Sequence, residues 1–205
     1  MGGKNQGQRE IELIALGASI GGIDALERIL TALPPDFPCV AVVQHIYPGF
    51  IGAYVARINK GAHMEALVAK DGAPLQRGRI YFADDGRQFR LSPSDIGYCF
   101  RYGETEKQSL HCPAVDVLFS SIAACDMARR SIGVILTGMG RDGAKGLLEM
   151  RQSGACTIGQ DERTSVVYGM PRMAYEIGAV QHQLPLERIS CELIDCVNKR
   201  KGAAH

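Results

Sequence analysis

The sequence lacks an excess of charge of either sign, and it lacks any long apolar run. Its 23 basic and 22 acidic side chains leave a formal net charge of +1 over 205 residues, which argues against nucleic acid as a partner and against a membrane-binding surface. No apolar stretch approaches the ~20 residues that cross a bilayer, so direct membrane insertion is not expected. Residues 1–9 are polar and lack the apolar core of a signal peptide. These absences favour a cytoplasmic protein.

The cysteines lack the spacing of a zinc site or of a disulfide framework. There are seven, an odd number, and no two of them form a C-x-x-C pair. Several lie in apolar runs, as Cys39 and Cys156 do, so we expect reduced cysteines packed as small hydrophobic side chains. The sequence therefore predicts no metal site, and nothing in it requires a cofactor.

What the sequence does contain is an alternation of short apolar runs with segments of helical periodicity. Hydrophobic residues make up 46% of the chain, a globular composition. This alternation predicts a single α/β domain over residues 10–199, with one doubly wound, mainly parallel sheet and helices on both faces, a three-layer α/β/α architecture. Residues 1–9 are expected to form a disordered lead-in and residues 200–205 a flexible tail. The clearest strand candidates are residues 11–16, 39–44, 64–69, 132–137 and 155–159.

The middle and the end of the chain are less clearly patterned. Two short strand candidates, 80–83 and 88–91, flank Asp84-Asp85-Gly86, which is a hairpin-like signal. Residues 92–112 are polar and indicate a surface excursion with one more strand near 98–102. Further segments are predicted as a helix over 115–130, a final edge strand over 179–183 and an amphipathic helix over 186–199.

One strand-to-helix junction carries a candidate nucleophile. The apolar run 11–16 leads into Gly17-Ala-Ser-Ile-Gly21, and apolar residues recur at helical spacing from Ile23. This fits a G-x-S-x-G turn, in which glycines allow a sharp bend that lifts the serine clear of the sheet. Free N–H groups at the start of the helix favour negative charge beside Ser19. An idle serine in a glycine-rich turn is the alternative, and this stretch alone leaves both open.

Two other polar side chains also follow apolar strands. His45 comes directly after 39–44, and Asp142 follows 132–137. Ligands of such a sheet bind beyond the carboxyl ends of its strands. Ser19, His45 and Asp142 are therefore predicted to meet at one edge as nucleophile, base and acid. Taken singly, His45 has a commoner role as a packed or capping histidine, and Asp142 also fits a helix N-cap.

Four other histidines compete with His45 for the role of base. His63 begins a strand rather than ending one, and His111 and His182 lie in weakly patterned segments. His205 is terminal. His45 is therefore the best placed of the five.

A second glycine-rich stretch offers a different interpretation. Residues 138–143 spell G-x-G-x-x-G between a strand and a helix, and Asp161 lies near the end of the next strand. This matches a dinucleotide-binding fingerprint with its acid for a ribose. However, little sheet follows to complete a nucleotide site, and Ser19 and His45 are left unexplained.

Five motifs follow one another along the chain from about Ile11 to Asn198. They are Gly17-Ala-Ser-Ile-Gly-Gly22, Val43-Gln-His45 with Pro48-Gly49-Phe50, Pro113-Ala-Val-Asp-Val-Leu-Phe119, Leu136-Thr-Gly-Met-Gly-Arg-Asp-Gly143, and Gln160-Asp-Glu162 with Gly169-Met170-Pro171. In this order they resemble the catalytic domain of the chemotaxis protein-glutamate methylesterase family, CheB.

The resemblance implies a Ser19-His45-Asp142 triad that hydrolyses glutamyl methyl esters on the cytoplasmic helices of methylated chemoreceptors and releases methanol. Some members of that family also deamidate receptor glutamines. The resemblance further implies that Met139 helps to hold the oxyanion through its backbone, as would the N–H near Ile20. Arg141, beside the acid, is a candidate contact for an acidic substrate surface, and an ordinary solvated charge is the equal alternative.

The sequence departs from the family pattern in three places. Ile20 replaces the usual threonine after the nucleophile, which keeps the backbone N–H but loses a hydroxyl. Residues 83–88 read Ala-Asp-Asp-Gly-Arg-Gln in place of Ala-Pro-Gly-Gly-Arg-His. Only about ten residues precede the first strand, so the family's usual receiver domain is absent from this sequence. The Ile20 departure keeps open a non-catalytic module of the same fold that binds receptors or nucleotides.

Overall fold

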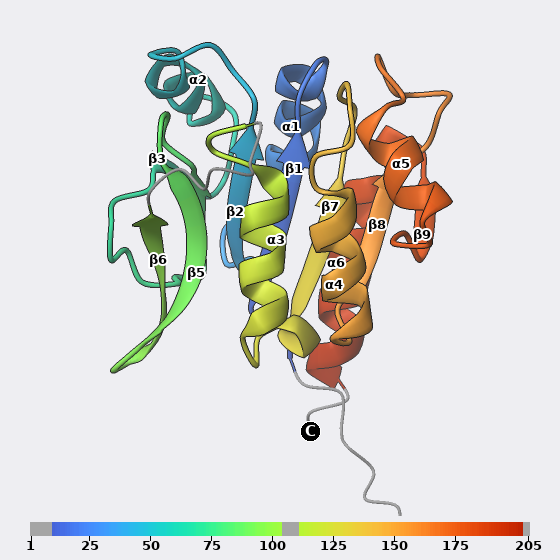
Figure 1. The fold of residues 1–205 in the computed structure, drawn as a ribbon. Coiled ribbons are helices and arrows are strands. Elements are labelled where there is room, and N and C mark those ends of the chain that lie inside the picture. Colours follow the sequence, from blue (N-terminus) through green and yellow to red (C-terminus); the bar gives the residue numbers. More distant parts are fainter. Residues whose placement is uncertain (1–9, 104–110, 203–205) are drawn as a thin grey trace, which may run out of the picture.

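Seven parallel strands form the central sheet, and helices cover both of its faces (Figure 1). The structure is a computed structural model and describes residues 10–103 and 111–202. The strands are β1 (Leu13–Ala18), β2 (Cys39–Gln44), β3 (Glu65–Val68), β4 (Arg79–Phe82), β5 (Gln88–Ser94), β6 (Gly97–Gly103), β7 (Ser131–Ile135), β8 (Cys156–Gln160) and β9 (His182–Leu184). The helices are α1 (Gly22–Leu30), α2 (Ile51–Ile58), α3 (Val115–Ala124), the 3₁₀ helix Ala128–Arg130, α4 (Ala144–Gln152), α5 (Met170–Glu176) and α6 (Leu186–Gly202).

The sheet has a hydrophobic core on each face because its strands are apolar on both sides. Ile14 and Leu16 of β1 pack with α1, α2 and α6, whereas Leu13 and Ala15 pack with α3, α4 and α5. Successive strand side chains point to opposite faces, so a continuous apolar run supplies both cores. The helices α3 and α4 accordingly lie in front of the sheet and α6 behind it (Figure 1). The predicted three-layer α/β/α architecture is confirmed.

The strand order places a topological switch point beside β1. The order is β3-β4-β2-β1-β7-β8-β9, so β1 lies between β2 and β7, and the chain winds outward from it in both directions. At such a point the loops after adjacent strands separate and leave a crevice at the carboxyl edge. The loops that follow β1, β2 and β7 carry Ser19, His45 and Asp142.

The predicted hairpin between residues 80–83 and 88–91 is wrong. Strand β4 has β2 on one side and β3 on the other, so neither of its edges is free to pair with β5. Strand β5 instead pairs with β6 as a separate antiparallel hairpin that packs on the α3 side of the sheet (Figure 1). The predicted excursion is thus an ordered hairpin up to Gly103, and residues 104–110 lie outside the described part of the chain.

Three other boundaries differ from those expected. The predicted helix over 115–130 ends at Ala124, because Cys125 adopts an extended backbone, and a 3₁₀ turn follows. The last strand is confined to His182–Leu184. The terminal helix α6 continues to Gly202, so residues 200–202 of the predicted tail are helical. Residues 203–205 and the predicted lead-in, residues 1–9, lie outside the described residues.

Gly17 illustrates how closely β1 approaches helix α3. A Cβ atom on Gly17 would lie 2.2 Å from Cγ1 of Val115, a fully buried side chain. Gly17→Ala is therefore expected to lower the free energy of unfolding by about 1–3 kcal/mol through overpacking, as measured by urea denaturation. Gly52→Ala, at an exposed helical glycine with open space around it, is the matched control and should cause no loss. Equal stability of Gly17→Ala and the parent chain would contradict this packing.

Candidate active site

Ser19 lies in the turn between β1 and α1 and contacts the loop that follows β7. Its N–H donates to the carbonyl of Thr137 at 3.0 Å, and its own carbonyl accepts the N–H of Gly22 at 2.8 Å. The bend is taken by Gly21, which has the left-handed φ of 78° that glycine tolerates at little cost. Because none of the non-glycine residues in the described ranges has a positive φ, Ser19 itself is unstrained. The serine is half-buried and faces the carboxyl edge of the sheet.

His45 is positioned by the continuation of the β1–β2 ladder. Its N–H donates to the carbonyl of Ala18 at 3.0 Å, which places it one residue beyond the end of β2 and level with the serine turn. The buried side chain of Gln44 adds two further hydrogen bonds. Its amide nitrogen donates to the carbonyl of Ser19 and to that of His45, both at 2.9 Å. One amide thus holds the backbones of the candidate nucleophile and base together.

The structure brings His45 and Asp142 into direct contact. Nε2 of His45 lies 2.9 Å from Oδ2 of Asp142, and both side chains are largely buried, at 14% and 8% exposure. The carboxylate lies off the direction of the ring N–H, so this contact does not reach the geometry of an aligned hydrogen bond. Among the described residues, Ser19 Oγ donates no hydrogen bond to His45. Catalytic hydrogen bonds are commonly long or misaligned before substrate binds.

Asp142 also caps the start of a helix, which is α3 and not the helix α4 that follows it in the sequence. Its Oδ2 accepts the N–H of Val115 at 2.8 Å, and its Oδ1 accepts the N–H of Asp116 at 2.9 Å. In return, Oδ1 of Asp116 accepts the N–H of Gly146 at 2.7 Å, in the first turn of α4. Each aspartate therefore caps the other's helix and satisfies N–H groups that lack a partner within it. The sequence suggested an N-cap at Asp142 of α4, and the structure shows that it caps α3.

These contacts lower the pKa of Asp142. Burial alone would raise the pKa of this carboxyl group, but the adjacent His45 ring and the two backbone N–H groups outweigh burial and hold the value below the ordinary one. The carboxyl group of Asp116 accepts fewer stabilising contacts, and burial raises its pKa. The environment of Asp142 therefore favours its ionised form, which is the form that balances charge on the imidazole.

A depressed pKa makes part of the stability depend on pH. The ionised Asp142 stabilises the fold fully above its unfolded pKa, about 3.9, and that contribution is lost as the pH falls through the lower native pKa. The difference in unfolding free energy between the parent chain and Asp142→Asn should therefore be largest near neutral pH and shrink below about pH 4. Urea denaturation of both proteins across pH 3–7 measures it. A difference independent of pH would contradict the assignment of an ionised Asp142.

Two backbone N–H groups are available beside the serine. Within the described ranges, neither Ile20 nor Met139 uses its N–H in a hydrogen bond to another residue. Their loops are fixed, because the hydroxyl of Thr137 donates to the carbonyl of Ile20 at 2.9 Å and accepts the N–H of Val167 at 3.0 Å. The side chains of Ile20 and Met139 are 49% and 68% exposed. Fixed, unpaired donors at this edge suit a developing oxyanion.

Of the competing histidines, only one reaches the site in the described structure. His63 and His182 are exposed at the starts of β3 and β9, and His205 lies outside the described residues. His111, by contrast, stacks on the ring of His45, with centroids 4.2 Å apart and an interplanar angle of 20°. Sequence reasoning treated His111 only as a rival base, because its polar surroundings gave no sign of its tertiary neighbour.

The G-x-G-x-x-G stretch is closely packed at Gly138. A Cβ atom on Gly138 would lie 2.4 Å from Sδ of Met170 and 2.7 Å from Cβ of Ser19, so side chains already fill that space. The carboxylate of Asp161, the expected ribose contact, instead accepts the N–H and the hydroxyl of Thr164 at 3.0 and 2.6 Å. The structure therefore gives no support to the nucleotide-binding alternative.

A groove leads away from Asp142 along helices α3, α4 and α5. Its volume is about 930 Å³, and its lining includes Asp142, His111, Arg141 and Arg172. Arg141 is exposed there.

Within residues 10–103 and 111–202, no cluster of three or more His, Cys, Asp or Glu side chains is placed to hold a metal ion. A search of the same residues also finds no helix with the length and apolarity to cross a membrane.

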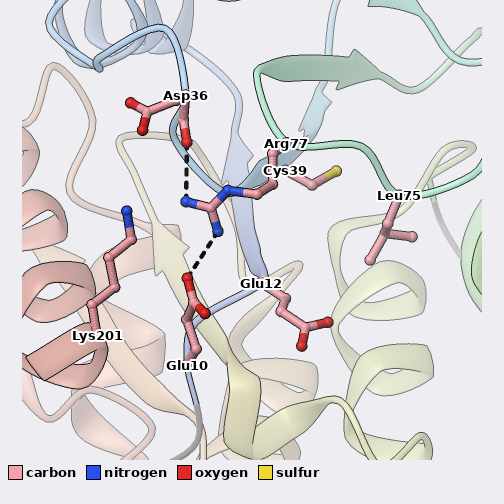
Figure 2. Close-up of a pocket in the computed structure, with 7 residues that line it drawn as sticks. All are labelled: Glu10, Glu12, Asp36, Cys39, Leu75, Arg77 and Lys201. Atoms are coloured by element: carbon pink, nitrogen blue, oxygen red, sulfur yellow. Dashed lines mark hydrogen bonds and ion pairs between the residues drawn. The ribbon is translucent and has the colours of Figure 1, made fainter. Parts of the chain in front are cut away.

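A second pocket, of about 500 Å³, lies at the opposite, amino-terminal edge of the sheet (Figure 2). There Arg77 donates to Glu10 at 3.2 Å and to the carbonyl of Asp36 at 3.0 Å, as Figure 2 shows. Burial raises the pKa of the Cys39 thiol in its wall to about 12, so the thiol is not a nucleophile. This pocket takes no part in the site at Ser19.

Comparison with known proteins agrees with this geometry. The sequence model of the family described as CheB methylesterase matches residues 14–193. The chain is 44% identical over 193 residues to a protein-glutamate methylesterase/protein-glutamine glutaminase of Agrobacterium fabrum, covering 94% of this chain and 55% of that protein. It is 44% identical over 190 residues to one of Sulfurimonas denitrificans, covering 93% and 54%. The chain thus spans about half the length of the curated relatives it matches.

A solved structure shows the same architecture. The crystal structure of the Thermotoga maritima CheB methylesterase catalytic domain superimposes with a TM-score of 0.87 at 32% identity, covering 91% of this chain and 99% of that one. An identity at this level over nearly the whole of a catalytic domain, together with the family match, supports more than a shared fold. The chain belongs to the CheB methylesterase family.

Proposed function

We propose that this chain is a serine hydrolase that removes methyl groups from glutamyl methyl esters. The observation that carries the proposal is the contact of His45 with Asp142 at the same sheet edge as the Ser19 turn. A buried carboxylate beside a histidine, next to a serine flanked by unpaired N–H groups, is the arrangement that acyl transfer requires. The catalytic assignments are Ser19, His45 and Asp142, with the N–H groups of Ile20 and Met139 as oxyanion donors.

In this mechanism, Oγ of Ser19 attacks the ester carbonyl carbon while His45 accepts the hydroxyl proton. Because Nε2 faces Asp142, Nδ1 is the nitrogen that exchanges this proton. Collapse of the tetrahedral intermediate breaks the bond to the methoxy oxygen, which takes the proton from His45 and leaves as methanol. Water then attacks the acyl-serine in the same way and releases the glutamate carboxylate. A glutamine amide would follow the same steps and release ammonia.

The surface around the site fits a macromolecular substrate. Large apolar side chains are exposed in the loops after β1, β2, β7 and β8: Ile20, Tyr47, Phe50, Met139 and Val166. An exposed apolar ring around a catalytic site is typical of a surface that contacts another protein. The proposed partners are the methylated cytoplasmic helices of chemoreceptors, which places the chain in the cytoplasm. Arg141 is proposed to contact acidic side chains beside the ester.

The test is release of methanol from a methylated receptor cytoplasmic fragment, compared with release of ammonia from the same fragment carrying glutamine. Methanol release by the parent chain supports the proposal. A chain that binds the fragment without releasing either product would favour the non-catalytic alternative. That alternative is raised by Ile20, which stands where the family usually has threonine. The two relatives above carry both activities in their names, which makes the comparison of the two products informative.

A further inference from the structure

His111 covers one face of the candidate catalytic base. The two imidazole rings stack with centroids 4.2 Å apart and planes 20° from parallel. His111 is itself exposed, whereas the His45 side chain beneath it is only 14% exposed. The stack is thus part of what separates the base from solvent.

The backbone that carries His111 is held in place by a buried glutamine. Gln88, at the start of β5, is fully buried. Its amide nitrogen donates to the carbonyl of His111 at 2.8 Å, and its Oε1 accepts the N–H of Ala114 at 2.9 Å. A buried amide with both ends paired is rigid, and breaking either bond would leave a buried polar group unsatisfied. The β5–β6 hairpin therefore presents His111 to the site through Gln88.

The base needs such support because its contact with Asp142 fixes the ring at one atom only. Nε2 of His45 lies 2.9 Å from the carboxylate, which lies off the N–H direction. A contact at one nitrogen leaves the plane of the imidazole free to tilt, whereas a contact over its face fixes that plane. Proton transfer from Ser19 requires the other nitrogen to point at the hydroxyl within a narrow range of angles.

We infer that His111 is a positioning residue for this reaction, which holds the ring plane of His45 by stacking and offers it an uncharged face when it becomes an imidazolium. Burial, together with the charge of His45, lowers the pKa of His111, while Asp142 acts in the opposite direction. His111 therefore remains neutral near pH 7 and adds no repulsion as His45 gains a proton. The inference rests on the proposed function, since it assigns His45 as the base.

The test compares His111→Ala, which removes the stack, with His111→Phe, which keeps a planar ring but no nitrogen. His182→Ala, at an exposed histidine on β9, is the matched control. Two readouts are taken: kcat and KM for methanol release, and the rate at which a fluorophosphonate probe labels Ser19. Labelling needs an activated serine but no receptor, so it separates failure of this inference from failure of the proposed substrate.

His111→Ala is expected to lower kcat and the labelling rate on the order of 10- to 100-fold with KM nearly unchanged, and His111→Phe to recover most of that loss. Wild-type rates in His111→Ala would overturn the inference. An equal loss of kcat and labelling rate in both variants would also overturn the inference, because that result would assign a polar role to His111. If His111→Ala is unstable, His111→Phe decides: a labelling rate close to that of the parent chain supports the stacking role, and loss of most of the labelling overturns it.

Discussion

Ser19→Ala is expected to abolish methanol release while leaving the urea unfolding midpoint unchanged. In the proposed mechanism the hydroxyl oxygen of Ser19 forms the acyl bond, and removing a triad serine costs on the order of 10⁶-fold in kcat. The fold does not depend on it, because the turn is held by the backbone of Ser19 through Thr137 and Gly22. Within the described residues, the side chain supplies no hydrogen bond that the fold would lose. The assay is methanol release from a methylated receptor fragment, with denaturation run on the same samples.

Asp161→Ala is the informative companion, because a nucleotide-binding protein would show the reverse ranking. Asp161 accepts hydrogen bonds from Thr164 in a loop after β8, so its loss should reduce stability and leave most of the activity. If Ser19→Ala kept wild-type hydrolysis while Asp161→Ala lost it, the mechanism proposed above would be wrong. Loss of fluorophosphonate labelling in Ser19→Ala, with labelling retained in Asp161→Ala, would support it independently of the receptor.

The sequence predicted those parts of the site that strand ends determine. Apolar runs identified β1, β2 and β7, and in a parallel sheet the residue after each run must reach the same edge. Ser19, His45 and the loop of Asp142 could therefore be assigned to one place before the fold was seen. The contact between His45 and Asp142 bears out their assignment to one edge. The roles of the three side chains stay predictions until the variants are assayed.

What the sequence did not predict depends on contacts between distant elements. The strands near 88–91 and 98–102 were predicted, but their pairing with each other was not, because it follows from packing on α3 and not from local pattern. The place of His111 beside His45 likewise has no local signal. The β4–β5 hairpin was expected because Asp84-Asp85-Gly86 is a good turn sequence, but turn residues cannot show that both edges of β4 are already occupied. Likewise, Asp142 resembles a local N-cap, and only the fold shows that it reaches the helix 27 residues earlier.

This cross-helix cap gives Asp142→Asn two separable consequences. An asparagine keeps one acceptor oxygen, so it can satisfy only one of the N–H groups of Val115 and Asp116 and should lower the free energy of unfolding by about 1–2 kcal/mol, the usual range for a lost cap. It also presents an amide to Nε2 of His45 and so favours the wrong tautomer, which in a serine triad reduces kcat on the order of 10⁴-fold. Methanol release and urea denaturation measure the two effects.

Asp116→Ala separates them, because it removes the reciprocal cap on Gly146 without touching His45. It should destabilise the protein by a comparable amount and retain far more activity than Asp142→Asn. If the two variants lost activity in proportion to stability, Asp142 would be acting only as a cap. We expect Asp142→Asn to lose far more activity than its loss of stability explains. The carboxylate of Asp142 caps α3, and in the proposed mechanism it also balances the positive charge that His45 gains as the base.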